Sequence, residues 1–597
     1  MIKATLKDKS TFLIQCDDDK MLELLKGVMD GSKVRCKNQI EIPWKASVLL
    51  LDYSQEGIEI DDKSKSVIDK LVKTKQTRIT NIKKIKEMYG KGVPFNYETK
   101  GVYKPMEHQK IMYSAMYYSN ATAIIADPGT CKTGPYLWLI DKLISQGKIK
   151  KALVITLSDL KKNVLEEMGV QTPSLKGVIL LGKERSNNIL NKKFKVTKKN
   201  RDYDVYIANY ESMRTLVDVI QDEYFDLVVL DEAHRVGFPG TFQTKAIINK
   251  FENTPYKYIV TGTLHANNLM SFYMPFRFLG ADVLPQANYY EFRRRYMRTV
   301  DPDQHIWVPL SGSKMLVAQI TGELSVMFKK EDCLDLPPII YEKYSCEMAP
   351  GQQTLYEQLQ SDLIAIIDDM CSKCDRKNAC DRSCEESVTA KNALVLSTKL
   401  HQIASGFYIN TRIKVNQETG SKTNDSNIIT LDENPKIRLL LNTLNNMPDG
   451  AKVIIWTNYT HACHLISEAL QKAYGPNSCL TCFGNEDAYE KVKEFETSKA
   501  LYIVANPKKM GVGQNIQYSH YQIFFSNSRS FVVRDQAEGR QHRKGQREKV
   551  TVIDLITENT VDELALKCLR EKKDLNLSLS QLSRVLKKPK DIDNIIY

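Results

Sequence analysis

The sequence predicts an α/β protein in which two doubly wound parallel sheets come one after the other along the chain. Between residues 100 and 280, short apolar runs alternate with helical stretches; examples are ATAIIAD, KALVITL, YDVYIAN, FDLVVLDEAH and YKYIVTGT. A second set, from about 435 to 560, includes AKVIIWT, KALYIVAN, YQIFFSN and KVTVIDLIT. Near-continuous apolar runs of this length are typical of parallel strands that helices cover on both faces. Their alternation with helices therefore predicts doubly wound sheets.

The remaining segments flank these two blocks. Residues 1–75 contain the strand-like TFLIQC and ASVLLLDY and the helical DDKMLELLKGV, which predict a small α+β domain. Residues 76–99 are a basic linker within a Lys-rich stretch, which is either a solvated helix or a contact for phosphates. Residues 281–430 favour a mostly helical insertion region that also contains the start of the second block, with a cysteine cluster at 371–384; the rest of the second block is 431–565. Residues 566–597 form a C-terminal tail.

Composition and charge restrict the classes of function. The chain of 597 residues has a net charge of +13, which permits a polyanionic partner without requiring one. It has no apolar run of the ~18 residues that a membrane helix needs, and its N-terminus lacks the apolar core of a signal peptide. Because the 13 cysteines cannot all pair within one chain, we expect a soluble intracellular protein with reduced thiols or metal ligands.

The segment ADPGTCKTG, residues 126–134, has the order of strand, loop and helix start that phosphate-binding loops use. Such a unit directs backbone N–H groups and a helix N-terminus at phosphates. Lys132 would neutralise charge on the β- and γ-phosphates of ATP, and Thr133 would hold Mg²⁺ through its hydroxyl. Cys131 occupies the position of the second glycine of this pattern, while Gly129 remains inside the loop.

Two acidic residues end a buried strand farther along the chain, in VVLDEAH. Asp231 is predicted to bind Mg²⁺ through water, and Glu232 to polarise the attacking water as general base. An isolated DEAH could instead be a surface turn. The lysine–threonine loop upstream favours the catalytic interpretation.

In the second block, MGVGQN (510–515) and QAEGRQHRKGQ (536–546) are the motifs that suggest chemistry. The glycines allow a ligand or nucleic-acid strand to approach the backbone closely. Arg540 and Arg543 stand three positions apart, so on a helix they lie on one face. Arginines delivered onto a γ-phosphate are the arginine-finger device of ATPases. An ordinary basic helix is the alternative.

Taken together, these motifs resemble those of one family. The set EHQ, GTCKT, DEAH, TGT, GVGQN and QAEGRQHRKGQ, spread over about residues 100–565, resembles the switch/sucrose-non-fermenting (Snf-type) DNA-dependent ATPases of helicase superfamily two. KLHQIASGFY and ENPKIRLLLNTL are similar to the start of the second lobe in the annealing-helicase and phage-like branch of that family. IPWKASVLLLDY is similar to the small DNA-binding modules that precede the motor in annealing helicases, so residues 1–75 could be an accessory module.

The resemblance implies two RecA-like lobes with ATP between them and DNA across both. It implies a motor that translocates on duplex or branched DNA and remodels or anneals it. The implied ATP-binding residues are Gln109, which reads adenine, and Gly129, Thr130, Cys131, Lys132, Thr133, Gly511 and Gly513. The implied catalytic residues are Lys132, Asp231, Glu232, Arg540 and Arg543, with Mg²⁺ on Thr133 and Asp231. Thr261, Gly262 and Thr263 would couple the ATP site to DNA.

Two residues depart from the family pattern. Leu264 stands where the family has proline after TGT, which removes a rigid φ but no catalytic group. Cys131 stands where glycine allows a backbone conformation that costs a residue with a Cβ about 1–3 kcal/mol. Cys131 therefore supports an alternative function, a nucleic-acid-binding scaffold whose ATPase is weak or lost. An RNA-directed helicase is a third possibility, which the form QAEGRQHRKGQ disfavours.

A cysteine cluster, CSKCDRKNACDRSC, lies in the insertion region. Its four thiolates are close enough in sequence to surround one tetrahedral Zn²⁺, and they are Cys371, Cys374, Cys380 and Cys384. The intervening residues are polar, so a metal would supply the fold of the segment. An iron–sulfur cluster would use the same ligands, and free cysteines or disulfides are the remaining alternatives.

Three further features have simpler interpretations. RRRYMR supplies Arg293, Arg294 and Arg295, which suit contact with DNA phosphates or form a charged helix face. CLTC (479–482) sits in an apolar, strand-like run and predicts buried thiols. The compact motor without long tails favours the cytoplasm of a bacterial or phage-infected cell over a nucleus.

Overall fold

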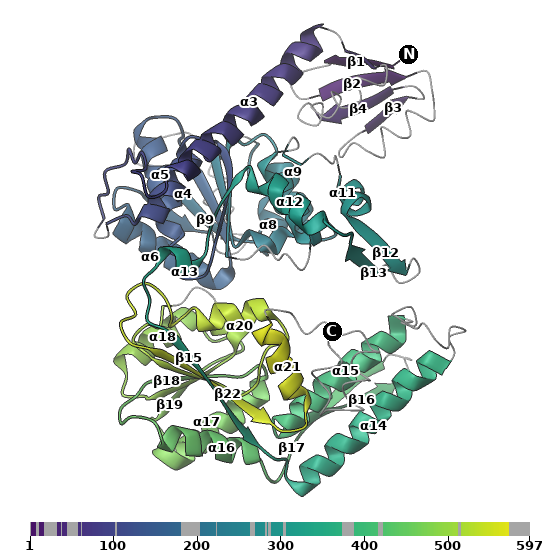
Figure 1. Cartoon of the computed structure of the whole chain (residues 1–597), viewed down its shortest axis with the longest axis vertical. Coiled ribbons are helices and arrows are strands. Elements are labelled where there is room, and N and C mark those ends of the chain that lie inside the picture. Colours follow the sequence, from purple (N-terminus) through teal and green to yellow (C-terminus); the bar gives the residue numbers. More distant parts are fainter. Residues whose placement is uncertain are drawn as a thin grey trace. The chain divides into compact units, whose positions relative to one another are not determined.

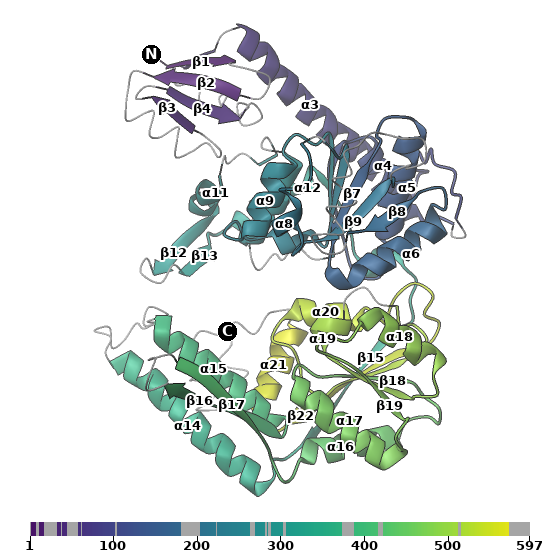
Figure 2. The same ribbon diagram turned by 180° about the vertical axis from the view of Figure 1, so that it is seen from behind.

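Figures 1 and 2 show the computed structural model of the chain. It describes residues 2–6, 11–16, 33–36, 39–43, 58–60, 62–101, 104–180, 203–222, 224–262, 269–280, 283–284, 288–301, 306–372, 387–415, 422–511 and 515–571. The chain divides into two compact units, Met1–Arg298 with Val308–Leu334, and Thr299–Trp307 with Asp335–Tyr597. Within the described ranges, no helix combines the length and the apolar character needed to cross a membrane.

The first unit begins with a five-stranded sheet in the order β3-β4-β2-β1-β5. Its strands are β1 (Ile2–Leu6), β2 (Thr11–Cys16), β3 (Lys33–Cys36), β4 (Gln39–Pro43) and β5 (Ile58–Ile60). β1 runs antiparallel to β2 and parallel to β5. TFLIQC forms β2, as predicted. The predicted strand ASVLLLDY and the predicted helix DDKMLELLKGV lie outside the described residues.

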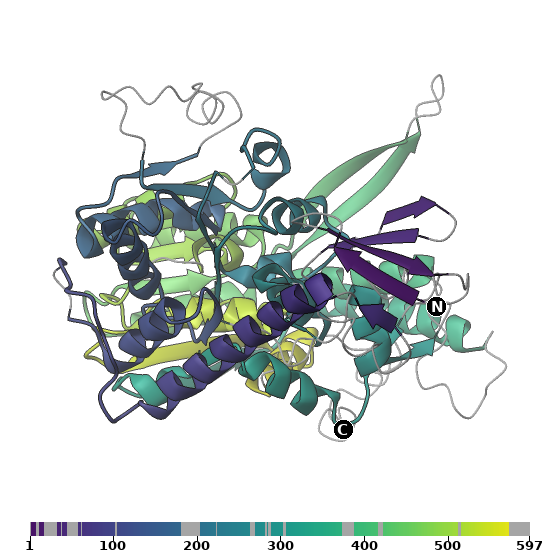
Figure 3. The ribbon, with the colours of Figure 1, turned by 90° about the horizontal axis from the view of Figure 1, so that it is seen from above.

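The Lys-rich stretch is largely one helix, α3 (Asp62–Glu87), which Figure 3 shows as a single rod. Its apolar side chains Ile82 and Ile85 are buried, whereas Lys83 and Lys84 between them are exposed. The helix therefore packs one narrow apolar stripe and leaves Lys83 and Lys84 in solvent, as an amphipathic surface helix does.

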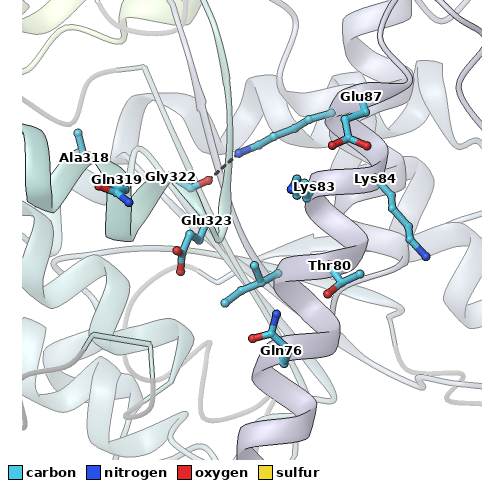
Figure 4. A pocket seen from close by; sticks show the side chains of 11 residues that line it. Gln76, Thr80, Lys83, Lys84, Glu87, Ala318, Gln319, Gly322 and Glu323 are labelled. Atoms are coloured by element: carbon cyan, nitrogen blue, oxygen red, sulfur yellow. Dashed lines mark hydrogen bonds between the residues drawn. The ribbon is translucent and has the colours of Figure 1, made fainter.

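A groove of about 760 Å³ separates the C-terminal part of α3 from α12 (Ser313–Gly322). Lys86 spans it and donates from Nζ to Gly322 O at 2.6 Å, whereas the Lys84 side chain points away from α12 (Figure 4). Burial lowers the pKa of Lys86 although Glu323 opposes this shift. The contact of this stretch with phosphates stays a prediction.

The core of the first unit is a seven-stranded sheet in the order β14-β6-β11-β10-β7-β9-β8. Its strands are β6 (Ala121–Ala126), β7 (Ala152–Thr156), β8 (Gly177–Ile179), β9 (Val205–Asn209), β10 (Leu227–Asp231), β11 (Tyr256–Thr261) and β14 (Ser325–Phe328). Every neighbouring pair is parallel. The central strands β6, β7 and β10 are buried at every position, which confirms the parallel, doubly wound sheet predicted from the apolar runs.

Helices precede, connect and follow the strands of this sheet. They are α4 (Glu107–Tyr117), α5 (Thr133–Ser145), α6 (Lys161–Gln171), α8 (Met213–Leu216), α9 (Phe242–Lys250), α10 (Tyr273–Leu279), α11 (Tyr289–Tyr296) and α13 (Lys330–Cys333). Because β14 pairs in parallel with β6, the unit extends to Leu334, well past the expected boundary at residue 280. The apolar run of β14 is short and comes soon after a helix, so its pattern did not predict a strand of this sheet.

The second unit contains a six-stranded parallel sheet in the order β15-β22-β21-β18-β20-β19. Its strands are β15 (Ile339–Cys346), β18 (Val453–Trp456), β19 (Cys479–Cys482), β20 (Tyr502–Ala505), β21 (Tyr521–Phe524) and β22 (Val550–Thr557). The second predicted parallel sheet is therefore also confirmed. The thiols of CLTC lie in β19 and are buried, as predicted.

Alternate residues of β18 enter two separate cores. Val453 and Ile455 pack with side chains of α16 (Pro435–Asn445) and α17 (Thr460–Tyr474). Ile454 and Trp456 pack on the other face with side chains of α18, α19 and α20, which Figure 2 shows opposite α16 and α17. Those three helices are α18 (Ala488–Thr497), α19 (Pro507–Met510) and α20 (Phe531–Glu538). Because helices cover both faces of the sheet at β18, its sequence VIIW is apolar at every position.

The insertion region is less helical than its sequence predicts. It contains the helices α14 (Pro350–Ser372) and α15 (Ser387–Ala404), which pack side by side. It also contains an antiparallel hairpin, β16 (Phe407–Val415) with β17 (Lys422–Thr430), and the first strand of the second sheet, β15. The hairpin strands lack the continuous apolar run of the sheet strands. Ile409, Ile413 and Val415 of β16 nevertheless stand at alternating positions, a strand signal that the helical prediction did not use.

One buried ionic group ties this insertion to the second sheet. Asp562, on α21 (Val561–Arg570), binds Lys436 of α16 through Oδ2 and lies 3.2 Å from His401 Nε2 of α15 through Oδ1. Thr557 N also donates to Asp562 Oδ2 at 3.2 Å. Burial acts to raise the pKa of Asp562, but Lys436 and His401 outweigh it and hold that pKa well below its usual range. The strings KLHQIASGFY and ENPKIRLLLNTL thus supply a histidine and a lysine to one carboxylate.

We predict that Asp562→Asn lowers the free energy of unfolding by about 3–5 kcal/mol, because it leaves Lys436 buried without a counter-charge. Urea denaturation measures this loss. Glu494→Gln, which removes an exposed partner of Lys491, is the control and should cost about 0.5 kcal/mol or less. Equal losses for the two variants would contradict the structural role of Asp562.

Because the pKa of Asp562 is depressed in the folded protein, the stabilisation that its charge provides should be present above about pH 4 and be lost as the pH falls further.

Candidate functional site

The site is built on the loop that joins β6 to α5. The loop turns tightly after Asp127, whose carbonyl accepts hydrogen bonds from Thr130 N at 3.3 Å and Thr130 Oγ1 at 2.8 Å. Gly129 has φ +90° and Cys131 has φ +57°. The residue in the second glycine position therefore does adopt the left-handed conformation that glycine favours, as the sequence pattern required.

Two side chains at the start of α4 hold this loop by its backbone. His108 Nε2 lies 3.1 Å from Thr130 O, and because a carbonyl only accepts, that nitrogen is the donor. Gln109 Nε2 donates to Cys131 O at 3.0 Å, while its Oε1 accepts from Met106 N at 3.0 Å. The amide of Gln109 therefore contacts the loop itself; its assignment to adenine stays a prediction. The sequence motifs did not indicate a role for His108, although its place beside Gln109 in EHQ was the available signal.

The other side of the loop is attached to the strand at the edge of the sheet. Asp127 N donates to Phe328 O at 3.1 Å, and Asp127 Oδ2 accepts from Lys330 N at 2.9 Å. These bonds explain why β14 belongs to the first unit. They also fix the residue at which the loop leaves β6.

Lys132 is directed back along the loop, where Nζ donates to Ala126 O at 2.8 Å. The end of β11 packs against it, because a Cβ added to Gly262 would lie only 3.2 Å from Lys132 Nζ and 3.3 Å from Pro128 Cδ. Thr261 and Gly262 are thus brought to the loop. Thr263 and Leu264 lie outside the described residues.

The acidic pair lies at the C-terminal end of the neighbouring strand β10. Asp231 accepts from Thr156 Oγ1 through Oδ2 and from Glu232 N through Oδ1, both at 3.1 Å. Burial and the charge of Glu232 raise the pKa of Asp231 to about 7, against the opposing effect of Lys132. A buried carboxylate destabilised in this way suits a divalent cation, which would compensate both negative charges. The residues present therefore fit Mg²⁺.

Glu232 turns away from the strand in a left-handed conformation, with φ +55°. Its Oε2 lies 3.3 Å from His234 Nδ1, and the same nitrogen lies 3.4 Å from Thr261 Oγ1. His234 therefore bridges the acidic pair and the end of β11. This contact gives DEAH and TGT a shared physical connection that the sequence could not supply.

In the second unit, the predicted helical face of Arg540 and Arg543 is wrong. α20 ends at Glu538, and both arginines lie in the irregular turn after it. Arg540 Nε donates to Gln536 O at 2.8 Å and its carbonyl accepts from Ile516 N at 3.1 Å. The C-cap of α20 is Gly539, so a spacing of three residues no longer places the two side chains on one face.

A third arginine, which the sequence motifs did not indicate, fixes α20. Arg534 is buried and donates to Asp554 of β22 from both Nη1, at 2.6 Å, and Nη2, at 3.2 Å. It also pairs with Glu538 and lies 3.4 Å from the centre of the Phe524 ring. Bidentate pairing of this kind fixes geometry strongly. Arg534 therefore fixes α20 against β22.

Other predicted residues are less well connected. Gly511 ends α19 and leaves no room for a Cβ, which would lie 2.1 Å from Pro507 O; Gly513 lies outside the described residues. On α11, Arg294 pairs with Glu291 and Arg293 stacks 5.3 Å from the Tyr290 ring centre. Arg295 is exposed, and the contact of these three arginines with DNA stays a prediction.

The predicted metal cluster mostly lies outside the described part of the chain. Cys371 is in the last turn of α14, whereas Cys374, Cys380 and Cys384 are not described. Among the residues that are described, no group of three potential ligands is arranged to hold a metal ion. Zinc at this cluster therefore stays a prediction.

Comparisons with known proteins agree with the geometry. Residues 44–409 match the SNF2-related domain. The chain is 24% identical over 501 residues to the DNA repair and recombination protein RAD54B of Gallus gallus, covering 77% of this chain and 52% of that protein. It is 22% identical over 483 residues to the ATP-dependent helicase brm of Drosophila melanogaster, covering 78% of this chain and 28% of that one.

Among solved structures, the SWI2/SNF2 ATPase core of Sulfolobus solfataricus in complex with dsDNA is 20% identical, with a TM-score of 0.36, and the match covers 84% of this chain and 98% of that one. The chain spans about half or less of the length of the two curated relatives named above. The domain match, however, takes in more than half of the present chain. The chain therefore belongs to the SNF2-related family.

Proposed function

We propose that this chain is a DNA-dependent ATPase that couples ATP hydrolysis to movement on duplex or branched DNA. The observation that supports it most is the convergence of three elements on one edge of the first sheet. The loop after β6, the acidic pair after β10 and the end of β11 share contacts through Lys132, Gly262 and His234. A scaffold that only bound nucleic acid would have no need for this arrangement.

In this proposal, each residue has a separate task. Backbone N–H groups of the loop and the N-terminus of α5 bind the phosphates, and Lys132 moves from Ala126 O to neutralise them. Thr133 and Asp231 would hold Mg²⁺, which when bound would compensate charge on the phosphate oxygens. Glu232 accepts a proton from the attacking water, and His234 orients its carboxylate.

The second unit is proposed to contribute Arg540 and Arg543 as the cations that stabilise the transferred phosphoryl group. Arg540 would have to release its bond to Gln536 O. The buried Arg534–Asp554 pair would keep the start of the turn fixed during this change. Remodelling or annealing of DNA is the proposed result of the movement. The relatives that are named helicases support a motor. Their names do not distinguish remodelling from annealing of DNA.

We predict that the wild type hydrolyses ATP with stimulation by duplex DNA, and that Lys132→Ala reduces turnover by about 100-fold or more, because the variant removes the cation nearest the phosphates. A coupled ATPase assay with and without DNA measures both effects. Lys250→Ala is the matched control, since it removes a lysine whose partner Asp222 is exposed, and its turnover should match the wild type. Wild-type turnover that is absent, or that survives Lys132→Ala, would refute the motor and favour the scaffold.

We also propose that Cys371, Cys374, Cys380 and Cys384 bind one Zn²⁺, on the basis of their spacing and of the paired helices α14 and α15 that precede and follow most of the segment. Elemental analysis of the purified protein should find one zinc per chain, and Cys371→Ser should lose it. Cys333→Ser, at a half-buried cysteine elsewhere in the chain, should keep it. Iron with visible absorbance would instead indicate an iron–sulfur cluster, and a metal-free native protein would exclude both.

A further inference from the structure

The turn after α20 contains polar side chains of QHRKGQ (541–546) to which the proposed function gives no task. Gln541 Nε2 donates to Ser519 Oγ at 2.7 Å and to Tyr521 O at 2.9 Å. Gln546 Nε2 donates to Gln517 O at 3.0 Å. These bonds attach the turn to β21 and to the chain just before that strand.

His542 makes a different contact, with the chain that arrives from the first unit. Its Nε2 lies 2.7 Å from Pro337 O, and because a carbonyl only accepts, that nitrogen is the donor. Pro337 follows soon after Leu334, where the first unit ends, and shortly before Ile339, where β15 begins. Every residue of β15 pairs with β22. His542 therefore attaches the turn to chain that leads directly into a fixed strand.

The same stretch of chain is attached at its other end to the phosphate loop, because Asp127 Oδ2 accepts from Lys330 N at 2.9 Å. We call residues 330–337 the connecting segment. Pro337 follows Lys330 by seven residues, and a chain of that length spans at most about 25 Å when it is fully extended. Pro337 and Pro338 also restrict the backbone at its end. The phosphate loop and the arginine turn are thus bonded to the two ends of one short connection.

We propose that His542 is a positioning residue for Arg540 and Arg543, which precede and follow it in the turn. Through its bond to Pro337 O, it ties the turn to the connecting segment, and the segment transmits a change at the phosphate loop to both arginines. This inference rests on the proposed function. Arginines of this kind act on charge in the transition state, so their placement affects turnover more than ATP binding. His542 does not touch the reacting atoms and is not a catalytic residue.

The first test compares His542→Ala with His542→Gln in the full chain. Alanine removes the donor, whereas the amide nitrogen of glutamine takes the place of Nε2 and can still donate to Pro337 O. We expect kcat for ATP hydrolysis to fall about five- to tenfold in His542→Ala, the value of one hydrogen bond, and to recover to within about twofold of the wild type in His542→Gln. The dissociation constant of a fluorescent, non-hydrolysable ATP analogue should change by about twofold or less.

A longer connecting segment should have the same effect while leaving both bonded ends intact. Insertion of Gly-Ser-Gly-Ser between Leu334 and Asp335 makes the connection flexible, and we expect it to lower kcat by a similar factor. Adding His542→Ala to the insertion should lower kcat by a further factor of about two or less, because both changes break the same connection.

His461→Ala is the matched control. It removes another half-buried histidine of the second unit, whose Nε2 lies 2.9 Å from Thr430 Oγ1, so it should lower the melting temperature about as much as His542→Ala and leave kcat unchanged. An unchanged kcat in His542→Ala, an equal loss in His461→Ala, or losses that multiply when the insertion and His542→Ala are combined would overturn the inference and leave the proposed function intact. A wild type without DNA-stimulated turnover would remove both.

Discussion

The candidate site depends on the two hydrogen bonds that hold the phosphate loop by its own carbonyls. His108 and Gln109, neighbours on α4, bind Thr130 O and Cys131 O. A left-handed conformation costs a residue with a Cβ about 1–3 kcal/mol, while each hydrogen bond contributes about 1 kcal/mol net. The conformational cost and the combined contribution of the two hydrogen bonds are therefore of similar size. The hydrogen bonds from α4 can therefore hold Cys131 in the conformation that glycine would adopt freely. A cysteine in place of the family's glycine is tolerable for this reason.

In the second unit, buried ionic groups hold the neighbouring elements in place. Arg534 of α20 pairs with Asp554 of β22. Asp562 of α21 pairs with Lys436 and contacts His401, and these contacts join the insertion to the second sheet. Such groups are poor sources of stability because their desolvation is costly. Their geometry is specific, however, since a displaced partner leaves a buried charge. We infer that they fix the register of the elements that carry the functional turns.

Local patterns predicted the central strands, whereas features that depend on long-range contacts were missed. Apolar runs identified those strands because burial on both faces requires them. β14 was missed, since its pairing with β6 joins segments about 200 residues apart. The motif spacing did not reveal that α20 ends at Glu538, before both arginines. The family resemblance selected Gln109 and Asp231, whereas His108 and Arg534 become visible only when their partners are placed.

The most direct test of the account is the equilibrium binding of ATP with Mg²⁺ to the wild type and to Cys131→Gly. If His108 and Gln109 hold the loop in its working conformation, both proteins bind, and their dissociation constants differ by about threefold or less. If the left-handed cysteine were uncompensated, a cost of about 1–3 kcal/mol would weaken the wild type by about 5- to 150-fold relative to the glycine variant. Binding that appears only with glycine at position 131 would contradict the central claim.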